Sequence, residues 1–68
     1  MQSGKVKSWD ASRGFGFIVS DEDDDLFVNV ADLHPSVQPK RLVEGQSVKF
    51  DVKSDMKGDK AINVRVQK

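Results

Sequence analysis

Hydrophobic and polar residues alternate along much of this chain with the period of two that is typical of β-strands. The clearest case is Val48, Phe50 and Val52, which alternate with Lys49 and Asp51. Because successive side chains of a strand point to opposite faces of a sheet, this segment predicts a strand with one buried face. Similar but less regular patterns predict four further strands, over residues 4–10, 14–20, 25–30 and 62–67.

Polar segments separate the predicted strands. Residues 21–24 are all acidic and predict a turn, because Asp favours turn conformations, and residues 54–59 predict a second polar turn. Residues 34–45 contain two prolines and little periodicity, so they predict a long connection, which in a small domain is often functional. No segment predicts a helix. The chain is therefore expected to be all-β, with five short strands in a single domain over residues 1–68.

A small barrel is the expected arrangement, because closing the sheet removes exposed strand edges. Burial is limited in a chain of 68 residues, which is near the lower limit for a domain that folds alone. Alternation places Phe15, Phe17 and Phe27 on the outer face of the sheet. The residues expected inside the barrel are Val6, Ile18, Leu26, Val28, Val48, Phe50, Val52, Ile62, Val64 and Val66.

Residues 13–18 (RGFGFI) are the most informative segment. Two glycines in one short strand indicate tight curvature or the close approach of another backbone. The Phe rings beside them would offer π-faces to solvent, and stacking of a nucleobase on such a ring contributes about 1–3 kcal/mol. On this pattern alone a second interpretation stays open, in which the rings pack in a small cluster of their own or against a partner protein.

The charge distribution is uneven. The chain has 11 basic and 11 acidic side chains and is neutral overall, whereas nucleic-acid-binding domains are usually basic. Six acids and no base lie in residues 21–32, so the rest of the neutral chain is positive by six. We interpret the acidic turn as a solvated loop that keeps the protein soluble. The alternative is that it repels phosphates and speeds the release of a bound strand.

The sequence excludes several classes of function. With no Cys and one His it offers no disulfide, no cysteine-based zinc site and no nucleophile paired with a base. We therefore expect no enzymatic activity, no metal, no cofactor and no small-molecule substrate. No apolar segment approaches the roughly 18 residues of a spanning helix and no signal peptide is recognised, so we expect no membrane association and a cytoplasmic location.

Residues 13–18 and 26–28 resemble the two ribonucleoprotein-type motifs of the bacterial cold-shock domain family. The resemblance covers nearly the whole chain, because it extends through residues 4–7, 24–25, 44–46, 58 and 61–64. It implies a five-stranded antiparallel OB-fold barrel that binds single-stranded RNA and DNA through its second and third strands. It also implies a role as an RNA chaperone or as a regulator of transcription or translation in the stress response to cold.

The resemblance assigns roles to individual residues. The three Phe residues match the family's stacking rings, and the basic residues match positions that contact backbone or bases. Asp25 matches an acid that hydrogen-bonds a base edge, and capping of the turn is its alternative role. The expected nucleic-acid-binding residues are Lys5, Lys7, Trp9, Arg13, Phe15, Phe17, Asp25, Phe27, Asn29 and His34.

The chain departs from the family pattern at several aromatic positions. Ser8 replaces the usual stacking Trp, and Trp9 stands at the following position, normally Phe, where it would partly restore a platform. Asn29 replaces the usual His, Val30 replaces an aromatic residue, and His34 is the only ring in the long connection. Because each lost ring removes stacking energy, we expect weak, salt-sensitive and largely sequence-tolerant binding of a short single strand.

A second function class stays open on these departures. The zero net charge and the missing aromatic residues favour an OB-fold protein-interaction module that has largely lost nucleic-acid binding. The retained Phe residues, with Lys7 and Arg13, favour nucleic-acid binding, which is our preferred interpretation. We expect a monomer, with a dimer left open.

Overall fold

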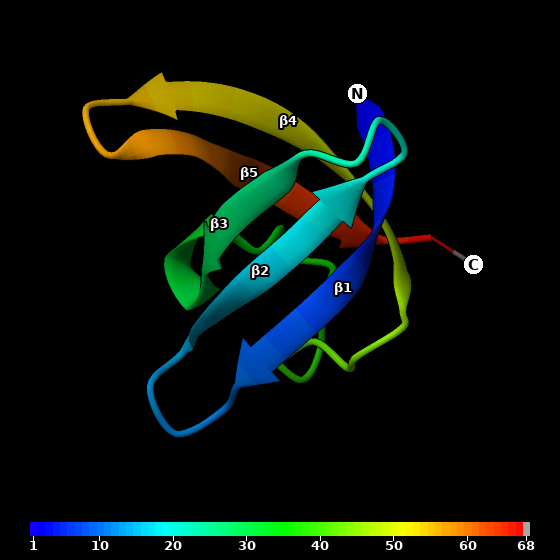
Figure 1. Cartoon of the computed structure of the whole chain (residues 1–68). Coiled ribbons are helices and arrows are strands. Elements are labelled where there is room, and N and C mark those ends of the chain that lie inside the picture. Colours follow the sequence, from blue (N-terminus) through cyan, green and yellow to red (C-terminus); the bar gives the residue numbers. More distant parts are fainter. Residues whose placement is uncertain (68) are drawn as a thin grey trace.

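The computed structural model describes residues 1–67, and within them the chain forms five strands and one turn of 3-10 helix (Figure 1). The all-β prediction is confirmed, although the helical turn was not expected. Lys68, the last residue of the predicted domain, lies outside the described residues. The elements are β1 (Gln2–Asp10), β2 (Phe15–Ser20), β3 (Asp25–Asn29), η1 (Val30–Asp32), β4 (Ser47–Asp55) and β5 (Gly58–Val66).

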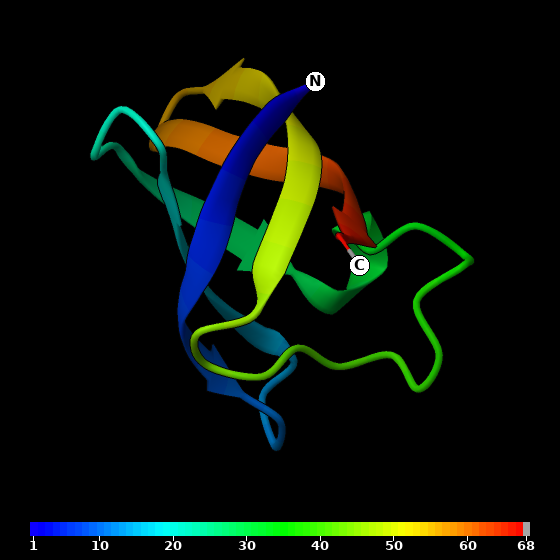
Figure 2. The same cartoon turned by 90° about the vertical axis from the view of Figure 1, so that its right-hand side faces the viewer.

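The strands close into a barrel in the order β1-β2-β3-β5-β4, with β4 paired back to β1. Figures 1 and 2 show β1, β2 and β3 side by side, and the β4–β5 hairpin completing the ring. Neighbouring strands are antiparallel except β3 and β5, which are parallel with Phe27 opposite Lys60 and Val28 opposite Ala61. The prediction of a barrel is confirmed, and the prediction that it is purely antiparallel is wrong at this one pairing.

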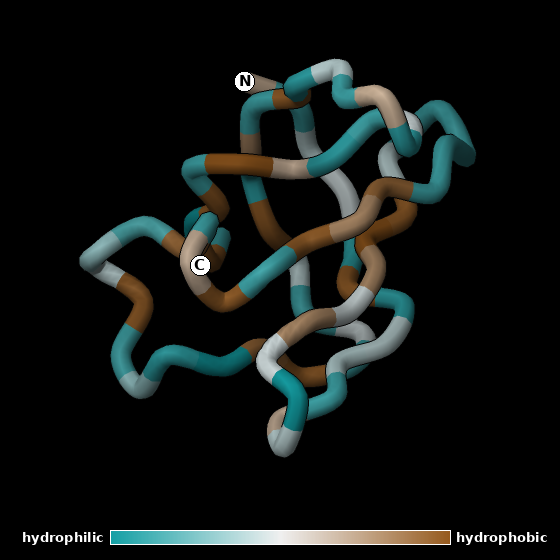
Figure 3. The backbone as a smooth tube through the Cα atoms, turned by 90° about the vertical axis from the view of Figure 1, so that its left-hand side faces the viewer, coloured by the Kyte–Doolittle hydropathy of each residue, from teal (hydrophilic) through white to brown (hydrophobic). Residues whose placement is uncertain are grey.

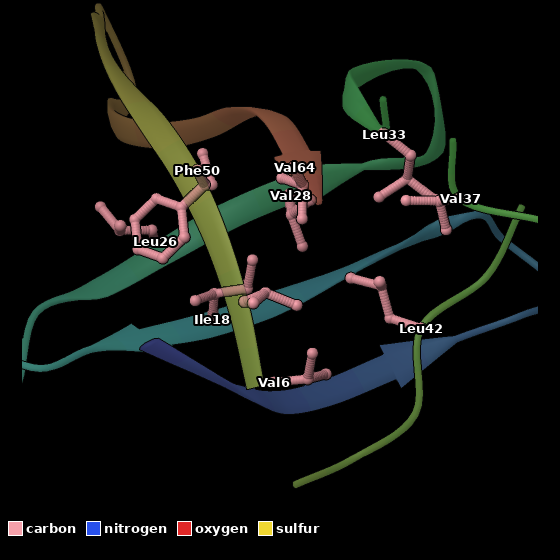
Figure 4. Packing of buried hydrophobic residues seen from close by; sticks show 11 residues of the cluster. Val6, Ile18, Leu26, Val28, Leu33, Val37, Leu42, Phe50 and Val64 are labelled. Carbon is pink, nitrogen blue, oxygen red and sulfur yellow. The ribbon is translucent and has the colours of Figure 1, made fainter. Parts of the chain in front are cut away.

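The core lies inside this ring. Figure 4 shows Val6, Ile18 and Val28 packed between the strands, together with Phe50 of β4 and Val64 of β5. Most of the predicted interior residues are buried, and Val52 and Val66 are partly buried against the core. The buried hydrophobic residues are Val6, Ile18, Leu26, Val28, Leu33, Val37, Leu42, Val48, Phe50, Ala61 and Val64.

The long connection between η1 and β4 contributes to the core. Leu33, Val37 and Leu42 are buried and gather at one end of the barrel (Figure 4). The connection is tied to β5, because the His34 N–H donates to the Val64 carbonyl at 2.8 Å. Figure 3 shows short hydrophobic stretches within this mostly hydrophilic segment. The pattern did not predict these core residues, because a segment without regular structure has no periodicity to reveal its buried side chains.

Ile62 was predicted inside the barrel, and this prediction is wrong. It is half-buried and pairs with Asp51 on the outer face, whereas its neighbour Ala61 is fully buried. The cause is a β-bulge in β5, where the register with β4 shifts and Asn63 adopts a left-handed conformation with φ of 55°. An extra residue in one strand reverses the alternation beyond it. Val64 therefore faces inward although Ile62 faces outward.

Gly16 lets β1 and β2 approach closely. A Cβ atom at this position would collide with the carbonyl oxygen of Ser8 and lie 2.9 Å from the Trp9 Cα atom. A second bulge lies in β1, where the register with β2 shifts between Val6 and Ser8. The prediction that glycine in this strand marks the approach of another backbone is confirmed.

Several predicted boundaries are wrong, since β1 begins at Gln2 instead of Gly4 and β2 at Phe15 instead of Gly14. Residues 54–59 were expected to form a turn, but β4 and β5 continue through most of this segment, and Asp55 pairs with Gly58. The third strand was expected to include Val30, but it ends at Asn29. The Asn29 side chain accepts a hydrogen bond from the Ala31 N–H at 3.0 Å and so begins η1, a role for which Asn is well suited.

Candidate nucleic-acid interface

Three Phe rings form a contiguous cluster on the outer face of β2 and β3, and we call it the Phe cluster (Phe15, Phe17 and Phe27). The Phe27 ring centroid lies 5.7 Å from that of Phe15 in a stacked arrangement and 5.8 Å from that of Phe17 in an edge-to-face arrangement. Phe17 is 40% exposed and Phe27 is 37% exposed, while Phe15 is half-buried. The predicted outer aromatic face is therefore present.

Strand register explains why the rings meet. Phe17 lies directly opposite Phe27, and Phe15 lies opposite Asn29, in the antiparallel β2–β3 pair. The residues that alternate with the rings, Gly16 and Ile18 in β2, face the interior and are buried. The apolar core thus fixes the backbone that presents the rings, so the cluster does not depend on contacts among its own side chains.

An open groove of about 1090 Å³ runs from the Phe cluster to the turn of the β4–β5 hairpin. Phe17 and Phe27 form one side of it, and Met56, which is fully exposed, lies on the other. The pattern of the sequence gave no signal for the hairpin side, because the contact arises only from the β3–β5 pairing. The groove is lined by Phe17, Phe27, Asn29, Ala31, Asp32, Asp55, Met56, Lys57, Gly58, Asp59 and Lys60.

The predicted cations beside the rings are paired with carboxylates. Lys7 Nζ lies 3.2 Å from Asp25 Oδ2, and both side chains are 56% exposed. Arg13 Nε lies 3.8 Å from Asp10 Oδ2. Exposed ion pairs of this kind contribute only about 0–1 kcal/mol, so a competing anion can displace them. Lys5 is exposed at the other end of β1, opposite Val19 of β2.

Asp10 organises the turn between β1 and β2. Its Oδ1 atom accepts hydrogen bonds from the Ser12 hydroxyl at 2.7 Å, the Ser12 N–H at 3.1 Å and the Arg13 N–H at 3.2 Å. These bonds favour the ionised form, so the Ser12 hydroxyl first and the Arg13 N–H second hold the pKa of Asp10 below its ordinary value. The turn therefore holds Arg13 close to the start of β2, beside Phe15.

Ser20, not Asp25, caps the acidic turn. The Ser20 hydroxyl accepts hydrogen bonds from the backbone N–H groups of Glu22 and Asp24, at 3.2 and 3.1 Å. Asp25 instead directs its carboxylate to Lys7. Asp25 and Phe27 are two residues apart on β3, so their side chains point to the same face. The Asp25 carboxylate therefore lies on the same face as the Phe cluster.

Trp9 does not lie with the Phe cluster. It pairs with Gly16 on the inner face of the sheet and is partly buried against the core. Its Nε1–H is buried and has no hydrogen-bond partner among the described residues. The bulge in β1 explains this position. Without it, Lys5 and Trp9 would share the outer face, but the extra residue between Val6 and Ser8 shifts the alternation by one and turns Trp9 inward. This position does not support the predicted role of Trp9 in the platform.

Asn29 and His34 are both engaged in local structure. The side-chain oxygen of Asn29 caps η1, while the residue still lines the groove beside Phe27. His34 is half-buried, its Nδ1 atom accepts from the Ser36 N–H at 3.0 Å, and it does not line the groove. The structure thus brings Asn29 to the Phe cluster and assigns His34 to the organisation of the long connection.

Residues 1–67 contain no group of three or more His, Asp or Glu side chains placed to hold a metal ion. They also contain no helix that is both long and apolar enough to cross a membrane.

The family model described as the "Cold-shock" DNA-binding domain matches residues 2–67. The chain belongs to the cold-shock domain family. The closed five-stranded barrel is consistent with the OB fold of cold-shock domains, with one parallel pairing. The family comprises nucleic-acid binders without enzymatic activity, which agrees with the expectation from the sequence.

Similar cold-shock proteins cover almost the whole chain. It is 43% identical over 65 residues to cold shock protein CspC of Bacillus subtilis, covering 96% of this chain and 97% of that protein. It is 41% identical over 63 residues to a cold shock-like protein of Thermotoga maritima, covering 93% and 94%. It is 39% identical over 64 residues to the major cold shock protein of Streptococcus pyogenes, covering 94% of each.

Proposed function

We propose that this cold-shock domain protein binds single-stranded RNA and DNA by stacking bases on the Phe cluster. The observation that carries the proposal is the exposure of Phe17 and Phe27 as adjacent rings on a rigid sheet. Every nucleobase has a π-face, so stacking tolerates many sequences. Asn29 and Asp25, which border the rings, are proposed to hydrogen-bond base edges.

The backbone of the bound strand is proposed to contact Lys5, Lys7 and Arg13. Phosphates would displace the carboxylates of Asp25 and Asp10 from Lys7 and Arg13, because those pairs are exposed and weak. Each displacement costs part of the gain from the new contact. The proposal therefore includes binding that is weak and strongly dependent on salt. Trp9 and His34 are left out of the interface on account of their positions.

Weak binding fits an RNA chaperone or a regulator of transcription or translation that acts in the cytoplasm as a monomer. On β1, the residue that faces outward next to the Phe cluster is Ser8. It lies opposite Phe17 and has no ring. Val30, the first residue of η1, is an exposed aliphatic residue. Fewer rings mean less stacking energy, which favours rapid release of the strand.

The test is a titration with oligothymidylates at several salt concentrations. Trp9 fluorescence reports on changes at the inner face of the β1–β2 pair. The anisotropy of a labelled oligonucleotide reports binding independently of Trp9. The proposal expects saturable binding whose log affinity decreases with log salt by about 0.7 per phosphate contact. Absence of binding at low salt by both methods would overturn it and favour the protein-interaction module.

A further inference from the structure

The Phe cluster continues into a row of basic side chains. Phe17 of β2 lies opposite Phe27 of β3, Phe27 lies opposite Lys60 of β5, and Lys60 lies opposite Lys53 of β4. Residues that are paired across neighbouring strands share a face of the sheet. Phe17, Phe27, Lys60 and Lys53 therefore form one row across the outside of the barrel.

A second basic pair lies further along the same hairpin. Lys49 of β4 is directly opposite Arg65 of β5, on the same outer face. We call Lys49, Lys53, Lys60 and Arg65 the hairpin basic face. Like charges placed directly opposite each other destabilise a sheet, and this hairpin contains two such pairs.

Few carboxylates compensate this face. Within residues 1–67, Lys60 pairs with Asp32 at 3.7 Å, and Lys49, Lys53 and Arg65 have no carboxylate within ion-pair distance. Asp51, in the middle of the face, accepts from Asn63 Nδ2 at 3.3 Å and lies 3.9 Å from the Met1 amino group.

The acids near the turn of the hairpin accept hydrogen bonds from residues of the hairpin itself. Asp59 accepts from the Ser54 hydroxyl at 3.2 Å, and Asp55 accepts from the Met56 N–H at 2.6 Å. Within residues 1–67, Lys49, Lys53 and Arg65 thus lack the ion pairs that Lys7 and Arg13 have, whereas Lys60 is paired with Asp32.

We propose that the hairpin basic face binds the phosphate backbone of the same single strand that stacks on the Phe cluster. This inference rests on the proposed function and extends its site from β2 and β3 onto β5 and β4. Lys60 connects the two parts, because it lines the groove beside Phe27 and also lies opposite Lys53 in the β4–β5 register. Since neighbouring strands are about 4.8 Å apart, Lys53 is only about 10 Å beyond Phe27.

The position of the face favours a nucleic acid over other polyanions. A nucleic-acid strand that leaves the Phe cluster through the groove, which also carries Asp32, Asp55 and Asp59, passes Lys60 first and then reaches Lys53, without crossing the acidic turn at residues 21–24. This face carries its charges without aromatic residues, so it contributes contacts to phosphates and no reading of bases. The contribution of the hairpin basic face to affinity therefore depends on the length of the bound oligonucleotide, whereas that of the Phe cluster does not.

The experiment compares Lys49→Gln/Lys53→Gln with Lys40→Gln/Arg41→Gln, a control that removes the same charge from the exposed long connection. Binding of oligothymidylates of about 4 and about 16 nucleotides, the range of site sizes for OB folds, is measured by anisotropy against salt. We expect the hairpin variant to bind the short strand like the unmodified protein. For the long strand, its salt slope should decrease by about 1.4, which corresponds to two lost phosphate contacts.

Thermal unfolding supplies a second readout. Removal of the like-charged neighbours should leave the fold as stable or more stable at low salt, so that weaker binding cannot result from unfolding. Equal effects of the hairpin and control variants on the long strand would overturn the inference. Binding of both proteins to anionic lipid vesicles is measured as well. If the hairpin variant keeps its binding of the long oligothymidylate and loses binding to the vesicles, the inference is overturned and the face binds a membrane surface. In both cases binding of the short strand to the Phe cluster would leave the proposed function intact.

Discussion

Lys7 Nζ lies 3.2 Å from Asp25 Oδ2, so that a cation of β1 meets an acid of β3 across the intervening strand β2. Both residues were expected to contact a bound strand, but the sequence gave no indication that they contact each other. The pair gives the interface an internal competitor, because the Asp25 carboxylate occupies the place on Lys7 that a phosphate would take.

This competition predicts opposite effects of two substitutions. Asp25→Asn should raise the affinity for oligothymidylate at low salt by up to about fivefold, the equivalent of an exposed ion pair, and steepen the salt slope. Lys7→Gln should lower the affinity, and Asp25→Asn should then have no further effect in the Lys7→Gln background. Anisotropy titrations of the four proteins form the required double-mutant cycle. If Asp25→Asn weakens binding in both backgrounds, the hydrogen bond of Asp25 to a base edge outweighs its competition for Lys7.

Phe27 is expected to be the most important ring, because it contacts both Phe15 and Phe17. Phe27→Ala should lower the affinity for a short oligothymidylate by about 1–3 kcal/mol, or about 5- to 150-fold. Val43→Ala is the control, because Val43 is 60% exposed on the long connection and lies outside the groove. Similar affinities for the two variants would show that the Phe cluster is not the binding site.

The long connection is expected to stabilise the fold through Leu42. Leu42→Ala should lower the free energy of unfolding by about 2–5 kcal/mol, because it leaves a cavity among buried side chains. Val43→Ala, at the adjacent exposed position, should change it by no more than about 0.5 kcal/mol. Urea unfolding followed by Trp9 fluorescence measures both. Equal effects would mean that the connection does not belong to the core.

Asp10 is expected to make stability depend on pH. Because its pKa is lower in the folded than in the unfolded state, the unfolded chain binds more protons, and stability increases with pH in the acid range. The contribution is present above the ordinary pKa of Asp and is lost as the pH falls through the folded pKa. Asp10→Asn should therefore flatten the acid side of a pH–stability profile measured by urea unfolding. Asp21→Asn, which removes an exposed acid from the other turn, should leave the profile closer to that of the unmodified protein.

The sequence predicted those parts of the fold that depend on local alternation. Val48 and Phe50 in β4, and Phe17 and Ile18 in β2, lie on the faces that a period of two assigns to them. The family resemblance then supplied the arrangement of the strands. The parallel β3–β5 pairing was not predicted, because it joins residues 27 and 60, and a local pattern contains no information about so distant a partner.

The failures have physical causes. Ile62 was misplaced because a bulge interrupts the alternation, and Leu33, Val37 and Leu42 were missed because irregular backbone has no period. At the candidate site the rings were predicted, but the ion pairs and the hairpin side of the groove were not. Those features depend on which strands become neighbours in space, and they become visible only when the barrel is closed.

The bulge at Asn63 determines which side of the barrel two cations occupy. Lys60 and Arg65 are five positions apart, so in a regular strand they would point to opposite faces. The single extra residue places both of them on the outside, with Ala61 and Val64 both inside. Deletion of Asn63 would leave Lys60 and Arg65 four positions apart, a spacing at which regular alternation also places both on the outside, so the strand without the bulge would keep the same faces and lose only the local bend.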